Sequence, residues 1–142
     1  MQSLASDKKY TIPAALLERI HKTFGFGYTD EDACFDEIRA TWEKDHYLAD
    51  PHTAVALALA PKERDNAAPC VVLSTASPYK FSGAVLAALG GSKQGSDFAD
   101  LRALESCTGI PAPGVLRALQ DKPVRFNEII APDEIRSVAE RL

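Results

Sequence analysis

The sequence predicts a helix-rich α/β domain with only two or three short strands. In most segments the apolar residues recur every three or four positions, which is typical of helices that bury one face. Residues 71–73 are instead apolar on both sides, as in a strand from the middle of a parallel sheet. Because so few strands cannot make a full sheet, we expect either part of a larger α/β domain or a helical domain with a small sheet.

Helix signals divide the first half of the chain. Residues 1–12 are polar and are expected to be extended, and an amphipathic helix then runs to Gly25. Thr29 is the expected N-cap of the next helix, because its hydroxyl can accept a hydrogen bond from a free amide. A third helix begins at Asp50, since aspartate suits the N-cap and Pro51 suits the first helical position.

The third helix has an unusual composition. Residues 51–60 are small and apolar nearly all round, and such a helix is usually buried. Residues 47–49 and 70–74 are the expected strands, and 124–130 is ambiguous between a loop and a short edge strand. The other expected helices are 82–89, 97–107, 115–120 and 132–142.

Composition narrows the class of protein. The chain has 142 residues, enough for one domain with a real core, and a formal net charge of −4 that disfavours nucleic acid or an anionic membrane as a partner. Its three cysteines are far apart, which favours reduced thiols over a disulfide framework or a zinc site. The first residues contain no apolar signal core, and no apolar run approaches the length of a membrane span. A cytoplasmic location is expected.

The stretch V-V-L-S-T-A-S-P-Y-K-F, residues 71–81, allows three interpretations. Ser77 and Lys80 have the spacing of an acyl-enzyme serine and its lysine, but the companion motifs of such enzymes are absent. Ser74 and Thr75 follow the expected strand, where ligands bind in open α/β sheets. The same hydroxyls could instead cap the next helix, and the pattern alone does not decide.

The segment around Asp50 is also open to more than one interpretation. His46 and His52 with Asp50 could suggest a metal site, but the helical spacing of a zinc motif and a third strong ligand are missing, so no metal is expected. Asp50 to Thr53 can be an ordinary helix start, or a helix N-terminus that binds an anionic ligand.

Two of these motifs together resemble one enzyme family. Y-L-A-D-P-H-T-A-V-A, residues 47–56, is similar to the A-D-P-H-T-A-V segment of threonine synthases, and residues 71–81 are similar to their V-L-S-T-A-H-P-A-K-F segment, in the same order and separation. The resemblance covers residues 8–90, while 91–142 is only compatible with it as a helical tail. We therefore treat 1–142 as a single C-terminal segment.

The resemblance implies a fold and an activity. Threonine synthases are pyridoxal-phosphate (PLP) enzymes of threonine biosynthesis, with the tryptophan-synthase-β-like fold, and they convert O-phosphohomoserine and water to threonine and phosphate. This chain resembles only the C-terminal third. The family's Schiff-base lysine and its glycine-rich phosphate loop lie in the N-terminal part, and neither is found here. No catalytic residue and no bound PLP are therefore expected in this chain alone, and inactivity is expected.

The resemblance also implies site residues. Thr75 matches the hydroxyl that hydrogen-bonds the pyridine nitrogen of PLP, with Ser74 beside it, and Asp50, His52 and Thr53 match a loop that borders the cofactor. Two positions depart from the family pattern, which has His in place of Ser77 and a small residue in place of Tyr79.

Two hypotheses about the whole protein follow. The first is a piece of a threonine synthase whose partner is the N-terminal remainder, with an apolar docking face that could also support self-association. The second is a stand-alone binding or regulatory module without catalysis.

Overall fold

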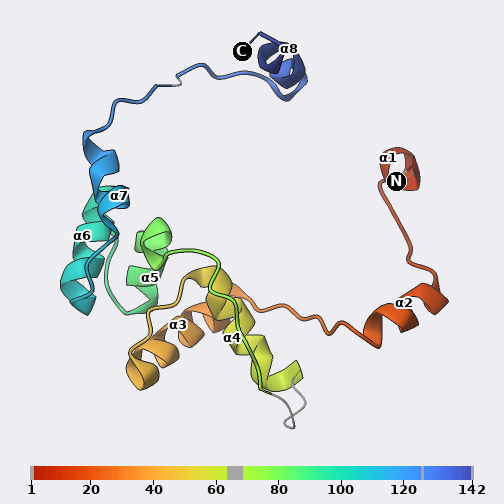
Figure 1. Cartoon of the computed structure of the whole chain (residues 1–142), viewed down its shortest axis with the longest axis horizontal. Coiled ribbons are helices and arrows are strands. Elements are labelled where there is room, and N and C mark those ends of the chain that lie inside the picture. The colour runs from red at the N-terminus through yellow and green to blue at the C-terminus, as the bar shows by residue number, and fades with distance from the viewer. Residues whose placement is uncertain (1, 64–68, 126, 142) are drawn as a thin grey trace.

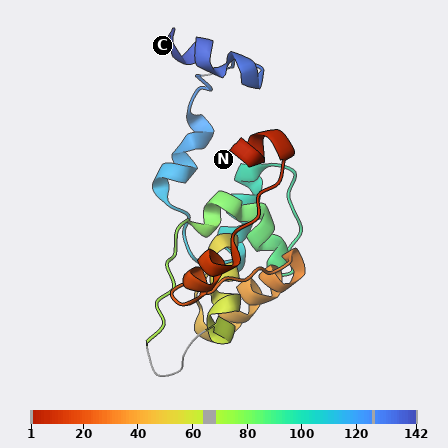
Figure 2. The ribbon, with the colours of Figure 1, turned by 90° about the vertical axis from the view of Figure 1, so that its right-hand side faces the viewer.

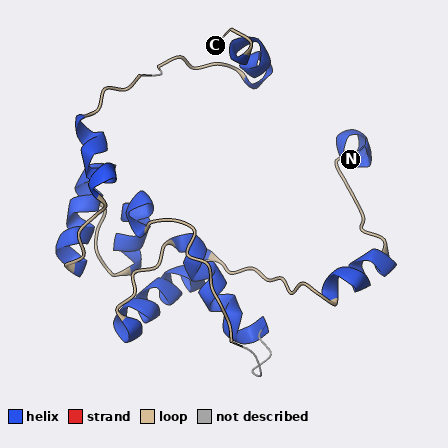
Figure 3. Ribbon diagram, in the orientation of Figure 1, coloured by secondary structure: helices blue, strands red, loops and turns tan. Residues whose placement is uncertain are grey.

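The computed structural model describes residues 2–63, 69–125 and 127–141 of the chain. Within these residues every regular element is a helix (Figure 3). In chain order they are α1 (Gln2–Asp7), α2 (Ala14–His21), α3 (Glu31–Asp45), α4 (Pro51–Glu63), η1 (Pro78–Phe81), α5 (Ser82–Ala88), α6 (Asp97–Thr108), α7 (Gly114–Arg117), η2 (Ala118–Asp121), η3 (Pro132–Glu134) and α8 (Ile135–Ala139), where η marks a short 3-10 helix. None of the described helices is long and apolar enough to cross a membrane.

Four helices form the body of the molecule. Helix α3 packs against α4 and α5, and α5 packs against α6 (Figure 1). Ile38, Val85 and Leu104 are among the fully buried side chains where these helices meet. Their core also contains Cys34, Leu48, Ala49, Ala54, Tyr79, Ala88, Leu101 and Ala112.

The two ends of the chain leave this body. Figure 1 shows α1 and α2 running away from it on one side, and it shows α8 standing apart beyond an extended stretch. The turned view in Figure 2 shows the same separation of α8. No buried residue is found in α2 or α8, so these two helices add no side chain to the core.

The helices in the second half agree with the sequence. The segments 82–89 and 97–107 appear as α5 and α6, and Gly109 ends α6 with a positive φ of 71°, where a residue without a side chain is favoured. The tail is helical at 115–120 and after Pro132, although α7, η2, η3 and α8 are all short.

The prediction of two or three strands is wrong for the described residues. Residues 47–49 are not a strand, because Leu48 and Ala49 pack into the core instead of pairing with another segment. Residues 70–74 are extended, but no backbone hydrogen bond joins them to another described segment, and a strand needs such a partner. The segment 124–130 includes residue 126, which lies outside the described residues, and the rest of it is irregular.

Three smaller expectations also need correction. The segment 1–12 is not wholly extended, because α1 forms where the chain contains neither glycine nor proline. The N-cap of α3 is Asp30 and not Thr29, since the Asp30 carboxylate accepts a hydrogen bond from the amide of Ala33 at 2.9 Å. In α4, Thr53 and Ala54 are buried but residues 55–60 are only half-buried, because α3 covers one side of this apolar helix and leaves another open.

Candidate functional site

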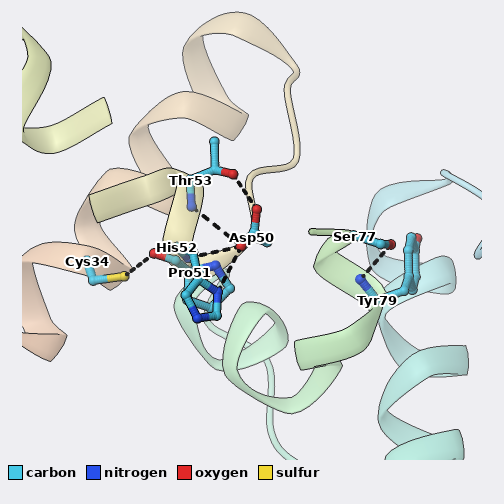
Figure 4. A network of polar contacts seen from close by, with 7 residues as sticks. All are labelled: Cys34, Asp50, Pro51, His52, Thr53, Ser77 and Tyr79. Atoms are coloured by element: carbon cyan, nitrogen blue, oxygen red, sulfur yellow. Dashed lines mark hydrogen bonds and ion pairs between the residues drawn. The ribbon is translucent and has the colours of Figure 1, made fainter. Parts of the chain in front are cut away.

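The start of α4 is built around the buried carboxylate of Asp50 (Figure 4). Oδ1 accepts hydrogen bonds from the amides of His52, at 3.0 Å, and Thr53, at 3.4 Å. Oδ2 accepts a short hydrogen bond from the Thr53 hydroxyl. Aspartate at the N-cap therefore does what its local sequence predicts, and Asp50 is only 1% exposed while doing so.

These hydrogen bonds decide the charge of Asp50. Burial by itself raises the pKa of a carboxyl, but the bonds donated by Thr53 and His52 outweigh it and hold the pKa of Asp50 below its ordinary value of 3.8. The carboxylate is therefore ionised at neutral pH. Because it occupies the positive end of α4, the place where an external anion would bind is already taken by the chain's own charge.

His52 is held by the same carboxylate. Its Nδ1 lies 3.2 Å from Oδ1 of Asp50, and an ionised carboxylate can only accept, so Nδ1 carries the proton and donates. The ring also packs against Phe81 of η1, with the ring centroids 5.0 Å apart. With Nδ1 occupied and the side chain 64% exposed, Nε2 is the nitrogen that is open to solvent.

Cys34 connects this loop to α3. Its thiol donates to the carbonyl oxygen of Pro51 at 3.4 Å. Burial and the negative charges of Glu31 and Asp50 raise the pKa of Cys34, so the thiol stays protonated and serves as a weak donor. The turn that carries His52 is therefore fixed from α3 as well as by its own cap.

Ser74 and Thr75 are placed differently. Both lie in the extended segment between α4 and η1, and both side chains are exposed. Neither hydroxyl is hydrogen-bonded within the described chain. The structure thus brings together Asp50, His52 and Thr53, and it leaves Ser74 and Thr75 free of them.

The serine–lysine interpretation finds no support in the geometry. The Ser77 hydroxyl accepts from the amide of Tyr79 at 3.3 Å and caps η1, and Lys80 is exposed. Tyr79 is buried and donates to the carbonyl oxygen of Ile110, which ties η1 to the loop after α6. The segment after Ala76 is therefore a turn into a helix that Ser77 caps, whereas Ser74 and Thr75, which were the candidate caps, cap none of the described helices.

These residues coincide neither with a metal cluster among the described residues nor with the cavity beside η1. Three metal-ligating side chains do not gather anywhere in the described parts of the chain, and His46 ends α3 in a left-handed conformation with its ring beside Trp42. A cavity of about 460 Å³ lies between η1, α5 and the start of α6, and none of the five predicted site residues lines it.

Two contributors to the site were not predicted. Phe81 was part of the quoted motif, but nothing in the sequence brings it to His52, because the two residues meet only when η1 folds against the start of α4. Cys34 was considered as one of three scattered cysteines, and its bond to Pro51 likewise depends on how α3 packs against α4.

Comparison with known proteins identifies the family. Residues 53–139 match the family model described as threonine synthase, C-terminal, which covers more than half of the chain. The chain belongs to this family.

Individual relatives agree with this assignment. Threonine synthase from Schizosaccharomyces pombe is 36% identical over 93 residues, which are 63% of this chain and 18% of that protein. Threonine synthase-like 1 from Homo sapiens is 35% identical over 86 residues, which are 61% of this chain and 12% of that protein. The chain therefore spans less than a fifth of the length of these relatives.

A solved structure extends the likeness to the fold. The X-ray structure of PLP-bound threonine synthase from Brucella melitensis superposes on this chain with a TM-score of 0.70 at 30% sequence identity. The match covers 99% of this chain and 26% of that one. The chain thus shares the fold of one part of a threonine synthase.

Proposed function

We propose that this chain is the C-terminal part of a threonine synthase, a PLP-dependent lyase that converts O-phosphohomoserine and water to threonine and phosphate. The observation that carries the proposal is the likeness to a PLP-bound threonine synthase, with a TM-score of 0.70 over 99% of this chain. The family match over residues 53–139 supports it independently of that structure. A cytoplasmic enzyme of threonine biosynthesis is the corresponding biological role.

The partner we propose is the remainder of the enzyme, and exposed apolar surface supports it. Val71 and Leu73 are 81% and 73% exposed, in an extended segment whose backbone pairs with no described neighbour. The half-buried side of α4 is apolar as well. Surfaces of this kind mark contact sites, and we infer that 70–74 becomes a strand by pairing with a sheet of the remainder.

The site residues face the cofactor in this proposal. The Thr75 hydroxyl donates to the pyridine nitrogen, and Ser74, Asp50, His52 and Thr53 border the ring. The free and exposed hydroxyls of Ser74 and Thr75 are consistent with a partner outside this chain. A neutral hydroxyl does not stabilise a protonated pyridinium as a carboxylate does, and this suits replacement chemistry better than transamination.

The residues of this chain fit only one side of a PLP site. No lysine stands in the Schiff-base context of the family, and no glycine-rich loop precedes a helix as a phosphate cradle requires. When bound, PLP supplies an electron sink for breaking bonds next to the amino carbon. The remainder of the enzyme would hold it, and we expect this chain alone to bind no PLP covalently and to make no threonine.

A chimaeric enzyme tests the proposal. In it, this chain replaces the matching stretch of the S. pombe threonine synthase, and the unmodified enzyme is the control. Phosphate release and threonine formation from O-phosphohomoserine are measured, with PLP loading followed by absorbance. Threonine formation by the chimaera is expected. A folded, PLP-loaded chimaera that makes no threonine would contradict the proposal and favour a non-catalytic module.

A further inference from the structure

The cavity between η1, α5 and the start of α6 is lined by charged groups that are not paired within the described chain. We propose that it binds a small α-amino acid in its zwitterionic form, with the ammonium group on Asp100 and the carboxylate on Lys93. This site lies apart from the residues proposed to border the cofactor. It goes beyond the proposed function and does not depend on it.

The cavity is formed by elements that pack on one another. Helix α5 packs against both η1 and α6, and the loop between α5 and α6 contributes Lys93, Gly95 and Ser96 to the wall. Phe81 and Ala84 supply apolar surface. Its volume of about 460 Å³ is in the range of small-molecule sites. Because all of these elements belong to the helical body, the cavity is a property of this chain by itself.

Asp100 places one free carboxylate oxygen at this cavity. The side chain is only 6% exposed, and its Oδ1 accepts a hydrogen bond from the amide of Gln94 at 2.5 Å. Oδ2 has no hydrogen-bond partner in the described chain, although every fully buried side-chain oxygen and nitrogen there has one. Oδ2 is therefore not sealed in the core, and it lies beside Gly83 in the cavity wall. A carboxylate oxygen in such a place can accept from an ammonium group.

Lys93 comes close to Asp100 without pairing to it. A Cβ built on Gly83 would lie 2.7 Å from Oδ2 of Asp100 and 3.4 Å from Cε of Lys93, so both side chains reach the same point. Nevertheless, Lys93 forms no ion pair with Asp100 or with any other described residue. Because Gly83 has no side chain, the space between the two charges stays open. A ligand that carries both charges can bridge them.

The charges around the cavity disfavour a ligand of a single sign. Lys80 and Lys93 line it together with Asp97 and Asp100, so the formal charges cancel. A phosphate ion would be attracted by the lysines but repelled by the carboxylates, and a divalent cation would meet the reverse. The described residues also form no metal cluster at this place. An α-amino acid carries an ammonium and a carboxylate on one carbon, and so satisfies both kinds of group at short range.

Titration of this 142-residue chain with glycine, serine and threonine tests the assignment. Isothermal titration calorimetry at neutral pH is expected to show one site for at least one of the three. Two analogues of the amino acid that binds best each lack one charge, one acetylated at the amine and the other amidated at the carboxylate. Each analogue should bind about tenfold more weakly, because a hydrogen bond to a charged group is lost. Inorganic phosphate should bind more weakly than the amino acid.

Two variants test the contacts from the side of the protein. Lys93→Gln and Asp100→Asn should each weaken binding by about tenfold. Both should fold, as checked by circular dichroism, because Lys93 is exposed and asparagine keeps an oxygen that can accept from the Gln94 amide. Lys44→Gln is the matched control. Lys44 is exposed on α3 and does not line the cavity, so this variant should bind like wild type.

The possible results separate clearly. Binding that depends on both charges of the amino acid and on both side chains supports the site. The inference is overturned if none of the three amino acids binds, if phosphate binds as tightly as they do, or if either folded variant binds as tightly as wild type. The titration uses neither PLP nor turnover, so its result is independent of whether the chimaeric enzyme makes threonine.

Discussion

The cap of α4 gives the most quantitative prediction. Replacing Asp50 by alanine removes the acceptor for two amides and leaves the buried Thr53 hydroxyl without a partner. Loss of an N-cap costs about 1 kcal/mol, and an unsatisfied buried donor adds about 1 to 3 kcal/mol. We therefore expect Asp50→Ala to lower the free energy of unfolding by about 3 kcal/mol, as measured by urea unfolding followed by circular dichroism.

The same change at Asp30 is the control. Asp30 also caps a long helix, but it is exposed and its carboxylate accepts from one amide, so Asp30→Ala should cost only about 1 kcal/mol. The two variants differ in burial and in the number of bonds lost, not in the type of residue. If Asp50→Ala costs no more than Asp30→Ala, the buried network does not stabilise the start of α4.

Acid should remove the difference in stability between wild type and Asp50→Ala. The pKa of Asp50 is lower in the folded chain than its ordinary value of 3.8, so its contribution is complete above that value and is lost as the pH falls through the folded pKa. The difference in free energy of unfolding between wild type and Asp50→Ala should stay constant near neutrality and narrow as the pH falls below 3.8.

Three further predictions concern packing and burial. Gly83→Ala should lower the free energy of unfolding by about 1 to 3 kcal/mol, because a Cβ there would lie 2.7 Å from Oδ2 of Asp100, whereas Gly114→Ala, with no atom within 4 Å, should be nearly neutral in the same urea assay. Tyr79→Phe should lower the free energy of unfolding by about 1 to 2 kcal/mol, since it leaves the carbonyl of Ile110 without its donor. Burial raises the pKa of Tyr79, so wild type loses stability as the pH rises above 10.0, and this loss should be weaker in the variant. In a thiol-reagent titration Cys70 and Cys107, which are exposed, should react quickly and Cys34 only after denaturant is added, and three equally fast thiols would contradict the burial of Cys34.

Elements that depend on local chemistry could be predicted from the sequence. Asp50 followed by Pro51 fixes the start of α4, and Gly109 fixes the end of α6, because each signal acts within one turn. The cap of α3 is Asp30 where Thr29 was predicted, because both neighbouring residues suit an N-cap and the sequence alone does not decide between them. The cluster of Asp50, His52 and Thr53 was predictable for the same reason, since its bonds span three residues or fewer.

Features that depend on distant partners could not be predicted in the same way. Residues 70–74 have the composition of a buried strand, but a strand forms only beside another, and the described chain provides none. The contact of Phe81 with His52 needs the packing of η1 on α4, which no local pattern encodes. Thr75 was assigned from its resemblance to a family motif, and the hydrogen-bond partner proposed for it is a cofactor, not a residue of this chain.

The most direct test of the account is therefore the role of Thr75. In the chimaeric enzyme Thr75→Val removes the hydroxyl while keeping the shape of the side chain, and Thr75→Ser keeps the hydroxyl as the control. If this chain supplies the contact to the pyridine nitrogen, Thr75→Val changes the absorption spectrum of bound PLP and slows threonine formation, while Thr75→Ser stays close to the parent. A PLP-loaded Thr75→Val enzyme with unchanged spectrum and turnover would contradict the central claim.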